Sequence, residues 1–304
     1  MRYFFNIFFL LLINLNAEVL NYTMQPSTLL SQKYMNIKIL DIKEIKFQRH
    51  NGIEFAELSD LAYRNKRLFA VGDRGVLYEF STAFSKGKIE DLSLIHAYNL
   101  KDENAKRLSK EYRDSEGLVF IEDKLAISFE RENRVDLYTV NGKRIKQLSI
   151  NKKLQDKKSY KSANKGLESV AFNKKYGIIT APEKPLHNKK YHKLYTKNNY
   201  WKFKAKGSIT ALEFIDENRV LVLLRKFDDF TRERKTTLIA LDLRKCKNSI
   251  CKTKMIAKFN SLCGWRIDNF EGLTKVAKNR FLMISDDNGS FFQKTLLVFF
   301  EIVN

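Results

Sequence analysis

The chain has 304 residues, of which 44% are hydrophobic and 12% aromatic, enough for a large core in one or two domains. Its net charge of +21 invites a nucleic-acid interpretation, but the lysines are scattered and only "KKLQDKKSYKSANK" is densely basic. No aromatic platform recurs beside that run, so we expect no specific nucleic-acid partner and a long-range preference for anionic ones.

The first 17 residues have the pattern of an export signal. Arg2 gives a positive tip, "FFNIFFLLLINL" is the apolar segment, and Asn16-Ala17 offers a small residue for cleavage. The apolar segment is short for a bilayer span, so we expect a cleaved signal peptide over 1–17, with an uncleaved anchor as the alternative. No long linker and no later transmembrane-length segment follows, which predicts a single exported domain over 18–304, periplasmic or secreted.

Five segments along the chain share one pattern. They are "AELSDLAYRNKRLFAVGDRG" from Ala56, "SEGLVFIEDKLAISFERENR" from Ser115, "LESVAFNKKYGIITAPEK" from Leu167, "LEFIDENRVLVLLRKF" from Leu212 and "NFEGLTKVAKNRFLMISDDN" from Asn269. Each has an early Glu, a short apolar run, a polar turn, a second apolar run and a charged end. Short runs rich in Val, Ile, Phe and Leu are typical of β-hairpins and too short for ordinary helices.

Further candidate strands lie between these hairpins, namely "VLYEF", "RVDLYTV", "KLYTK", "TTLIALDL" and "TLLVFFEI". Each repeat then has about four strands, and the early glutamates are roughly fifty residues apart, near the period of propeller blades. Blades stacked in a ring cover one another's faces. The sequence therefore predicts an all-β β-propeller of five or six antiparallel blades, with five preferred. We expect "NIKILDIKEIKF" to close the ring against the strands after Phe291; an open β-sandwich is the alternative.

Three cysteines lie in the last third of the chain, at Cys246, Cys251 and Cys263. The segment "KCKNSIC" can close a small disulfide loop in an oxidising compartment. The spacing offers too few ligands for a metal site. With the first two paired, we expect Cys263 to be a buried thiol.

Each hairpin brings the charged ends of its segment together, because the start of one antiparallel strand lies beside the end of the next. In a propeller the first strand is innermost, so all these groups should crowd around one mouth of the central channel. We expect the following groups: Glu57 with Asp73 and Arg74, Glu116 with Glu130 and Arg131, Glu168 with Glu183 and Lys184, Glu213 with Arg225 and Lys226, and Glu271 with Asp286 and Asp287. Crowded carboxylates raise one another's pKa values unless cations lie among them.

We assign three roles at this mouth. The carboxylates that could hold a hard cation, with Ca²⁺ the best match to oxygen ligands, are Glu57, Asp73, Glu130, Glu168, Glu183, Glu213 and Asp287. The residues expected at the reacting centre, where they could also hold metal, are Glu116, Glu271 and Asp286. Substrate oxygens should bind Arg74, Arg131, Arg225 and Lys184, because guanidinium forks suit phosphate geometry. The alternative is that one Glu per blade only ties turns to backbone amides.

These segments resemble the phytase-like family described as "esterase-like activity of phytase", whose members are exported bacterial proteins. The resemblance runs from about Glu57 to Ile302, and "NFEGL…SDDN" with the following "FQKT" is its most specific element. It implies a β-propeller and hydrolysis of a phosphate or ester substrate. The chain departs from the family at Ser59-Asp60, commonly Ser-Gly, and at Gly289, commonly bulkier. Neither change removes a carboxylate from the mouth.

Motifs of other hydrolases are absent from the sequence. It contains no G-x-S-x-G, no H-E-x-x-H and no P-loop, and its four histidines follow no ligand spacing. We therefore expect metal-assisted hydrolysis rather than Ser-His-Asp chemistry. The alternative is a non-catalytic propeller that binds an anionic ligand or a protein partner at the same mouth. We expect a monomer in either case.

Overall fold

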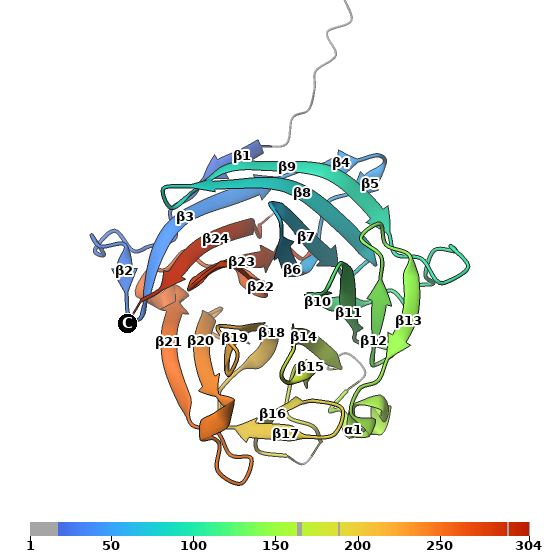
Figure 1. Ribbon diagram of the computed structural model, residues 1–304. Coiled ribbons are helices and arrows are strands. Elements are labelled where there is room, and N and C mark those ends of the chain that lie inside the picture. Colours follow the sequence, from blue (N-terminus) through green and yellow to red (C-terminus); the bar gives the residue numbers. More distant parts are fainter. Residues whose placement is uncertain (1–17, 163–165, 188, 291, 304) are drawn as a thin grey trace, which may run out of the picture.

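Five antiparallel β-sheets stand around a central axis, so the fold is a five-bladed β-propeller (Figure 1). The computed structural model describes residues 18–162, 166–187, 189–290 and 292–303. The predicted signal peptide over 1–17 lies outside the described residues. Among the described helices, none is long and apolar enough to cross a membrane.

Each of the first four blades has four strands that follow one another in the chain. Blade 1 contains β6 (Leu58–Arg64), β7 (Arg67–Gly72), β8 (Val76–Ser85) and β9 (Lys88–Asn99). Blade 2 contains β10 (Ser115–Ile121), β11 (Lys124–Phe129), β12 (Arg134–Tyr138) and β13 (Arg144–Leu148). Blade 3 contains β14 (Leu167–Asn173), β15 (Gly177–Pro182), β16 (His192–Tyr195) and β17 (Tyr200–Phe203). Blade 4 contains β18 (Ser208–Phe214), β19 (Arg219–Phe227), β20 (Arg234–Asp242) and β21 (Thr253–Asn260).

Blade 5 joins the two ends of the chain. It contains β22 (Asn269–Ala277), β23 (Arg280–Asp286) and β24 (Thr295–Ile302), and it is completed by β3 (Ile37–Lys46), with β1 (Glu18–Asn21) and β2 (Lys33–Tyr34) beside β3. The register runs from Thr295 opposite Ile45 to Ile302 opposite Ile37. The predicted closure by the N-terminal segment is therefore confirmed.

Short elements complete the ring. They are the hairpin of β4 (Arg49–His50) and β5 (Ile53–Glu54), the helix α1 (Lys152–Gln155), and the 3-10 turns η1 (Lys157–Ser159), η2 (Leu243–Lys245) and η3 (Ser261–Cys263). Cys246 and Cys251 form a disulfide, as the sequence predicted. The prediction of a buried Cys263 is wrong, because η3 lies on the surface and exposes this thiol.

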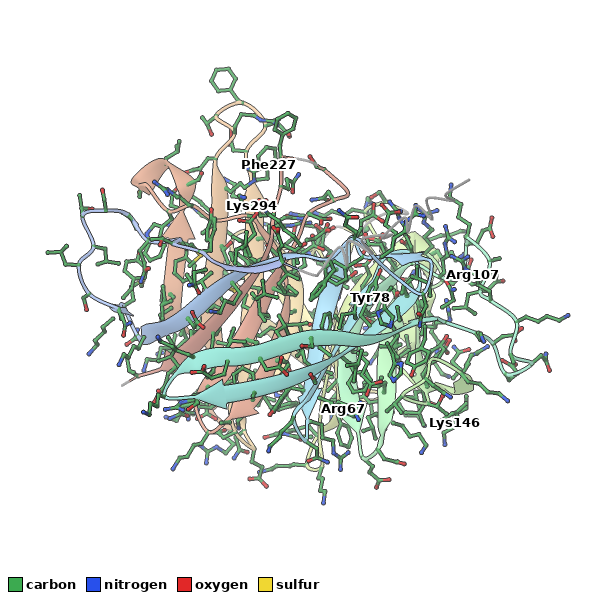
Figure 2. The ribbon with its side chains drawn as sticks, turned by 90° about the horizontal axis from the view of Figure 1, so that it is seen from above. Arg67, Tyr78, Arg107, Lys146, Phe227 and Lys294 are labelled. Atoms are coloured by element: carbon green, nitrogen blue, oxygen red, sulfur yellow. A yellow bond between two sulfur atoms is a disulfide. The ribbon has the colours of Figure 1, made fainter. Side chains whose placement is uncertain are left out.

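The apolar side chains form five separate clusters, one at each interface between neighbouring blades. The second strand of blade 1 illustrates this packing. Every residue of β7 after the first is buried, because the blade is covered on both faces. Blades that cover each other in this way leave their charged strand ends at the two faces of the ring. We call the face where the inner strands begin the mouth face; Figure 2 shows Phe227 and Lys294 toward it and Arg67 toward the opposite face.

The inner strands β6, β10, β14, β18 and β22 each carry a β-bulge near their first residues, where the pairing register with the second strand shifts. The residues in the bulges are Ser59, Glu116, Glu168, Thr210 and Glu271. A bulge leaves its residue outside the ladder and re-aims its side chain. The fold therefore presents one such position from every blade near the mouth face.

The glycine after the bulge explains the repeated Glu-Gly-Leu pattern. A Cβ on Gly272 would lie 2.8 Å from the Cα of Asp60, and one on Gly117 would lie 2.7 Å from the backbone N of Val170. Neighbouring inner strands approach too closely there for a side chain. Blade 1 has Asp60 at this place, and its side chain instead reaches the backbones of two neighbouring inner strands.

Candidate functional site

Carboxylates of blades 2 and 3 form one cluster at the mouth face. Single carboxylate oxygens of Asp114, Glu116 and Glu130 lie within 4.8 Å of one another, and so do those of Glu130, Glu168 and Glu183. We call these five residues the acid cluster. Glu116 and Glu168 occupy bulges, whereas Glu130 and Glu183 directly follow β11 and β15. The predicted approaches of Glu116 to Glu130 and of Glu168 to Glu183 are confirmed, and the cluster could hold a metal ion.

The two bulge glutamates of the acid cluster are buried, whereas Asp114 is half-buried and bonded to Arg131. Glu116 and Glu168 are only 9% and 7% exposed. Burial, followed by the charges of Asp73 and Glu168, raises the pKa of Glu116 well above its usual value. Burial, followed by the charges of Glu183 and Glu271, likewise raises the pKa of Glu168. These carboxyls therefore lie where an added cation would be strongly favoured.

Arg225 is the less exposed of two arginines that lie next to this cluster; the other is Arg131, which bonds to Asp114. It contacts the carboxylate of Glu271 and the amide oxygen of Asn269, and its Nη2 lies 3.9 Å from Oε1 of Glu183. Asn269 also donates from Nδ2 to Oε1 of Glu271 at 2.8 Å. Burial lowers the pKa of Arg225, but Glu271 and Glu168 outweigh it and leave the pKa raised. One guanidinium from blade 4 thus holds acids of blades 3 and 5.

Two further acids titrate far from their usual range. Burial, followed by the charges of Glu271 and Asp73, raises the pKa of Asp286 to about 9. Burial and the charge of Glu271 raise the pKa of Asp73 to about 7, although a hydrogen bond from the Ser59 hydroxyl opposes the shift. At neutral pH Asp286 therefore holds a proton, while Asp73 titrates near neutral pH. The expected proximity of Glu271 and Asp286 is confirmed.

The remaining predicted cationic residues lie farther out. Arg74 pairs with Glu57, as predicted, and donates from Nη1 to Glu54 at 2.9 Å. Arg131 donates from Nε to Asp114 at 2.6 Å. The side chains of Arg74 and Arg131 are 46% and 44% exposed, so both lie at the rim and balance acids there.

The predicted pairing of Glu213 with Arg225 is wrong. The register of β18 and β19 places Ser208 opposite Arg225 and Glu213 opposite Leu221, toward the other face of the ring. Glu213 accepts hydrogen bonds from the backbone N–H groups of Phe214 and Lys275 instead. The equivalent of Glu116 in blade 4 is Thr210, which occupies the bulge.

Asp287 also serves the backbone. It accepts hydrogen bonds from the N–H of Gly289 at 3.0 Å, from the Thr295 hydroxyl at 3.0 Å and from the N–H of Glu57 at 3.2 Å. These bonds tie blade 5 to the segment that enters blade 1. For Glu213 and Asp287, the alternative interpretation of acids that bind backbone amides fits the structure better than metal ligation.

Three residues at the mouth were missing from the prediction. Asp114 completes one metal-type triad, Asn269 positions Glu271, and the Ser59 hydroxyl bonds to Asp73. Asp114 and Asn269 each stand two residues before a bulge Glu, in "DSEGL" and "NFEGL", so this shared spacing was the available signal. Ser59 takes the place of the bulge Glu in blade 1, which only an alignment on the bulge reveals.

A pocket of about 920 Å³ opens beside Arg225, and we call it the basic pocket. Its charged lining has seven cationic residues, Lys184, Lys206, Arg225, Lys226, Arg232, Arg234 and Lys235, against three acids, Glu183, Asp229 and Asp268. Of the four predicted substrate-binding residues, Arg225 and Lys184 meet here. Arg131 lies in a different pocket of about 580 Å³ with Lys157 and Tyr160. The mouth face thus joins an acid cluster to a cationic hollow.

Two solved structures resemble the chain in part and share little of its sequence. Glutaminyl cyclase from Myxococcus xanthus superposes with a TM-score of 0.45 at 10% identity, covering 82% of this chain and 92% of its own. The PQQ-bound aldose sugar dehydrogenase from Streptomyces coelicolor gives a TM-score of 0.42 at 8% identity, covering 86% and 98%. No protein of curated function matches the sequence. The family described as "Phytase-like: Esterase-like activity of phytase" matches residues 53–289, and the chain belongs to this family.

Proposed function

We propose that the protein is an exported phytase-like hydrolase that acts on a phosphate or ester substrate at the mouth of its propeller. The observation that carries this proposal is the acid cluster beside a pocket lined by seven cationic residues. Acids alone would repel an anionic substrate, whereas the basic pocket offers it a place next to them. The disulfide and the N-terminal signal pattern support a periplasmic or secreted location.

The acid cluster fits a hard divalent cation, and Ca²⁺ is the proposed one. Its five members are all carboxylates, and Ca²⁺ takes about six to eight oxygen ligands, with backbone oxygens and waters able to complete the set. Within the described residues no His or Cys joins these groups, which disfavours zinc. When bound, the ion would neutralise charge on substrate oxygens and acidify a bound water. Glu116, Glu130, Glu168 and Glu183 would hold it, with Asp114 as an additional ligand.

The chain itself supplies an acid and an oriented partner carboxyl. Asp286, with a pKa of about 9, can hold a proton at its carboxyl and give it to a leaving-group oxygen. Glu271 beside it contacts Arg225 and accepts a hydrogen bond from Asn269, so its carboxyl is held in place. An acid with a raised pKa beside a second, oriented carboxyl is an arrangement that acid–base catalysis uses. Lys184 and the outer side of Arg225 would orient the anionic part of the substrate in the basic pocket.

The test is hydrolysis by the purified chain from residue 18 onward. Phosphate release from phytate and acyl release from p-nitrophenyl esters are measured with Ca²⁺ and with chelator. We expect Ca²⁺-dependent turnover of one substrate class that the double variant Glu271→Ala/Asp286→Ala lacks. Equal rates for the wild type and the double variant on both classes would refute hydrolysis of these substrates.

A second candidate is a propeller that binds an anionic ligand without turning it over. The observation in its favour is the excess of cationic residues in the basic pocket, which is suited to binding in itself. Calorimetry with phytate distinguishes the two candidates. Saturable binding that persists in Asp286→Ala, with no phosphate released by the wild type over the same period, would support the binding protein.

A further inference from the structure

The mouth face carries exposed apolar side chains that the proposed function does not use. Phe230 is 97% exposed and Phe292 is 90% exposed, while Leu262 and Phe227 are 64% and 40% exposed. Single exposed apolar residues are common, but a group of large ones on one face marks an interaction surface. We call these four residues the apolar tip.

The four residues come from three neighbouring loops. The guanidinium of Arg234 lies 5.7 Å from the ring centre of Phe227, and the N–H of Arg234 donates to the hydroxyl of Ser261, directly before Leu262. The basic pocket is lined both by Phe227 and by Gln293, the residue after Phe292. Figure 2 shows the loop that follows Phe227 rising above the rest of the mouth face. Phe230 lies in this loop, between β19 and β20.

Cationic side chains surround the apolar tip. Lys206, Lys226 and Arg232 are exposed and line the pocket at its base, and the Arg232 guanidinium lies 5.0 Å from the ring centre of Phe227. Three acids lie in the same loop. Asp228 accepts hydrogen bonds from Thr231, Glu233 pairs with Lys235, and Asp229 is exposed. The exposed Lys206, Lys226 and Arg232 outnumber Asp229, so the outward charge around the aromatic rings is positive.

The opposite face of the ring is charged, and its described residues expose apolar side chains less fully: Met35, Val140 and Ile250 are 43%, 40% and 44% exposed. Its turns between inner and second strands are Asn65-Lys66, Glu122-Asp123, Lys174 to Tyr176, Asp216 to Asn218 and Lys278-Asn279. They are almost entirely polar. The net charge of +21 acts on both faces, so charge alone does not single out the mouth face. The mouth face is distinguished by exposed aromatic rings that have lysine and arginine side chains beside them.

We propose that the apolar tip docks the mouth face on an anionic lipid surface. Aromatic rings on a protruding loop can enter the interfacial layer, where flanking cations meet lipid phosphates. A protein partner or a second copy of the chain would also cover apolar side chains, but neither would need the surrounding cations. This proposal is independent of hydrolysis and of Ca²⁺.

Vesicle sedimentation tests the proposal with the chain from residue 18 onward. Vesicles of phosphatidylcholine alone are compared with vesicles that also contain phosphatidylglycerol, at low and high salt. We expect binding only to the anionic vesicles, weakened by salt. Phe230→Ser should lower the partition coefficient about tenfold or more. Leu30→Ser removes a side chain that is 96% exposed outside the apolar tip and should leave binding unchanged.

A charge pair and a fluorescent probe complete the test. Lys226→Glu should weaken binding about fivefold or more, whereas Lys174→Glu, which changes the net charge equally on the opposite face, should have a much smaller effect. A tryptophan in Phe230→Trp should be quenched by brominated lipid in anionic vesicles. Absence of anionic-vesicle binding, full binding by Phe230→Ser or an unquenched probe would overturn the proposal. So would a dimer in ultracentrifugation that Phe230→Ser dissociates while vesicle binding is unchanged.

Discussion

Two groups of buried carboxylates in the same ring have opposite surroundings. Asp60 accepts three backbone hydrogen bonds, from Leu61 and Leu118 at 2.8 Å and from Leu273 at 2.9 Å. Glu116 and Glu168 at the mouth are instead surrounded by further acids, which raise their pKa values beyond the effect of burial. Burial raises the pKa of Asp60 as well, but its backbone hydrogen bonds oppose the shift, whereas at Glu116 and Glu168 the neighbouring acids add to it. The crowded acids at the mouth are therefore understandable as parts of a functional site.

Removal of the central tie should have the largest effect. Asp60→Ala leaves three buried backbone N–H groups of blades 1, 2 and 5 without their acceptor. We expect the free energy of unfolding to fall by about 3 kcal/mol or more, since each unsatisfied buried donor costs about 1–3 kcal/mol. Urea denaturation measures this. Asp60→Asn keeps an acceptor oxygen and should lose less; a loss below about 1 kcal/mol in Asp60→Ala would show that these bonds do not hold the inner strands.

The next largest effect should be a difference in stability between variants of Arg225 and Arg74, two arginines that pair with acids at the mouth. Arg225 is 26% exposed and faces acids of two blades, so Arg225→Gln should lower the free energy of unfolding by about 2 kcal/mol. Arg74 is 46% exposed and pairs with Glu57 and Glu54, so Arg74→Gln should cost less than about 1 kcal/mol. Denaturation of both variants without metal gives the comparison. Equal losses would place Arg225 among ordinary surface ion pairs.

A mouth acid should behave in the opposite sense to Asp60. Glu168→Gln removes a carboxyl whose ionised form is disfavoured in the folded state, so the metal-free protein should gain about 1 kcal/mol of stability. The same change should weaken the thermal stabilisation by millimolar Ca²⁺, because ligand binding stabilises only the state that binds. Glu90→Gln alters an exposed acid far from the mouth and should change neither quantity. A lower free energy of unfolding in Glu168→Gln would contradict the interpretation that the crowded acids destabilise the metal-free protein.

The ring and much of its mouth were predictable from the sequence for a physical reason. Paired apolar runs with turn residues define hairpins, and the charged run ends then meet at one face, which correctly placed Glu116 with Glu130 and Glu168 with Glu183. Bulges leave no such signal, because one extra residue in a strand does not alter the apolar pattern. The sequence pattern therefore aligns Glu213 with the early glutamates of the other repeats, although the bulge residue of blade 4 is Thr210. Asp114 was missed because it precedes its hairpin.

The pH dependence of stability tests the protonation of Asp286. Between pH 6.5 and 9 the folded state holds a proton on Asp286, whose pKa is about 9, whereas the unfolded carboxyl is already ionised. The folded state then binds more protons, so the free energy of unfolding falls as pH rises through this window. His192 does not interfere, because burial lowers its pKa to about 4 and its unfolded form titrates near 6.5.

With chelator present, we therefore expect the Tm to fall from pH 6.5 to 9, by roughly 2–4 °C for each kcal/mol lost. Ca²⁺ should reduce this fall, because a cation near the mouth favours the ionised carboxyls. Asp286→Asn, which cannot ionise, should reduce it without Ca²⁺. Differential scanning calorimetry across this pH range measures all three curves. An unchanged slope in Asp286→Asn would show that other groups cause the pH dependence. It would also contradict the protonated Asp286 that acid catalysis requires.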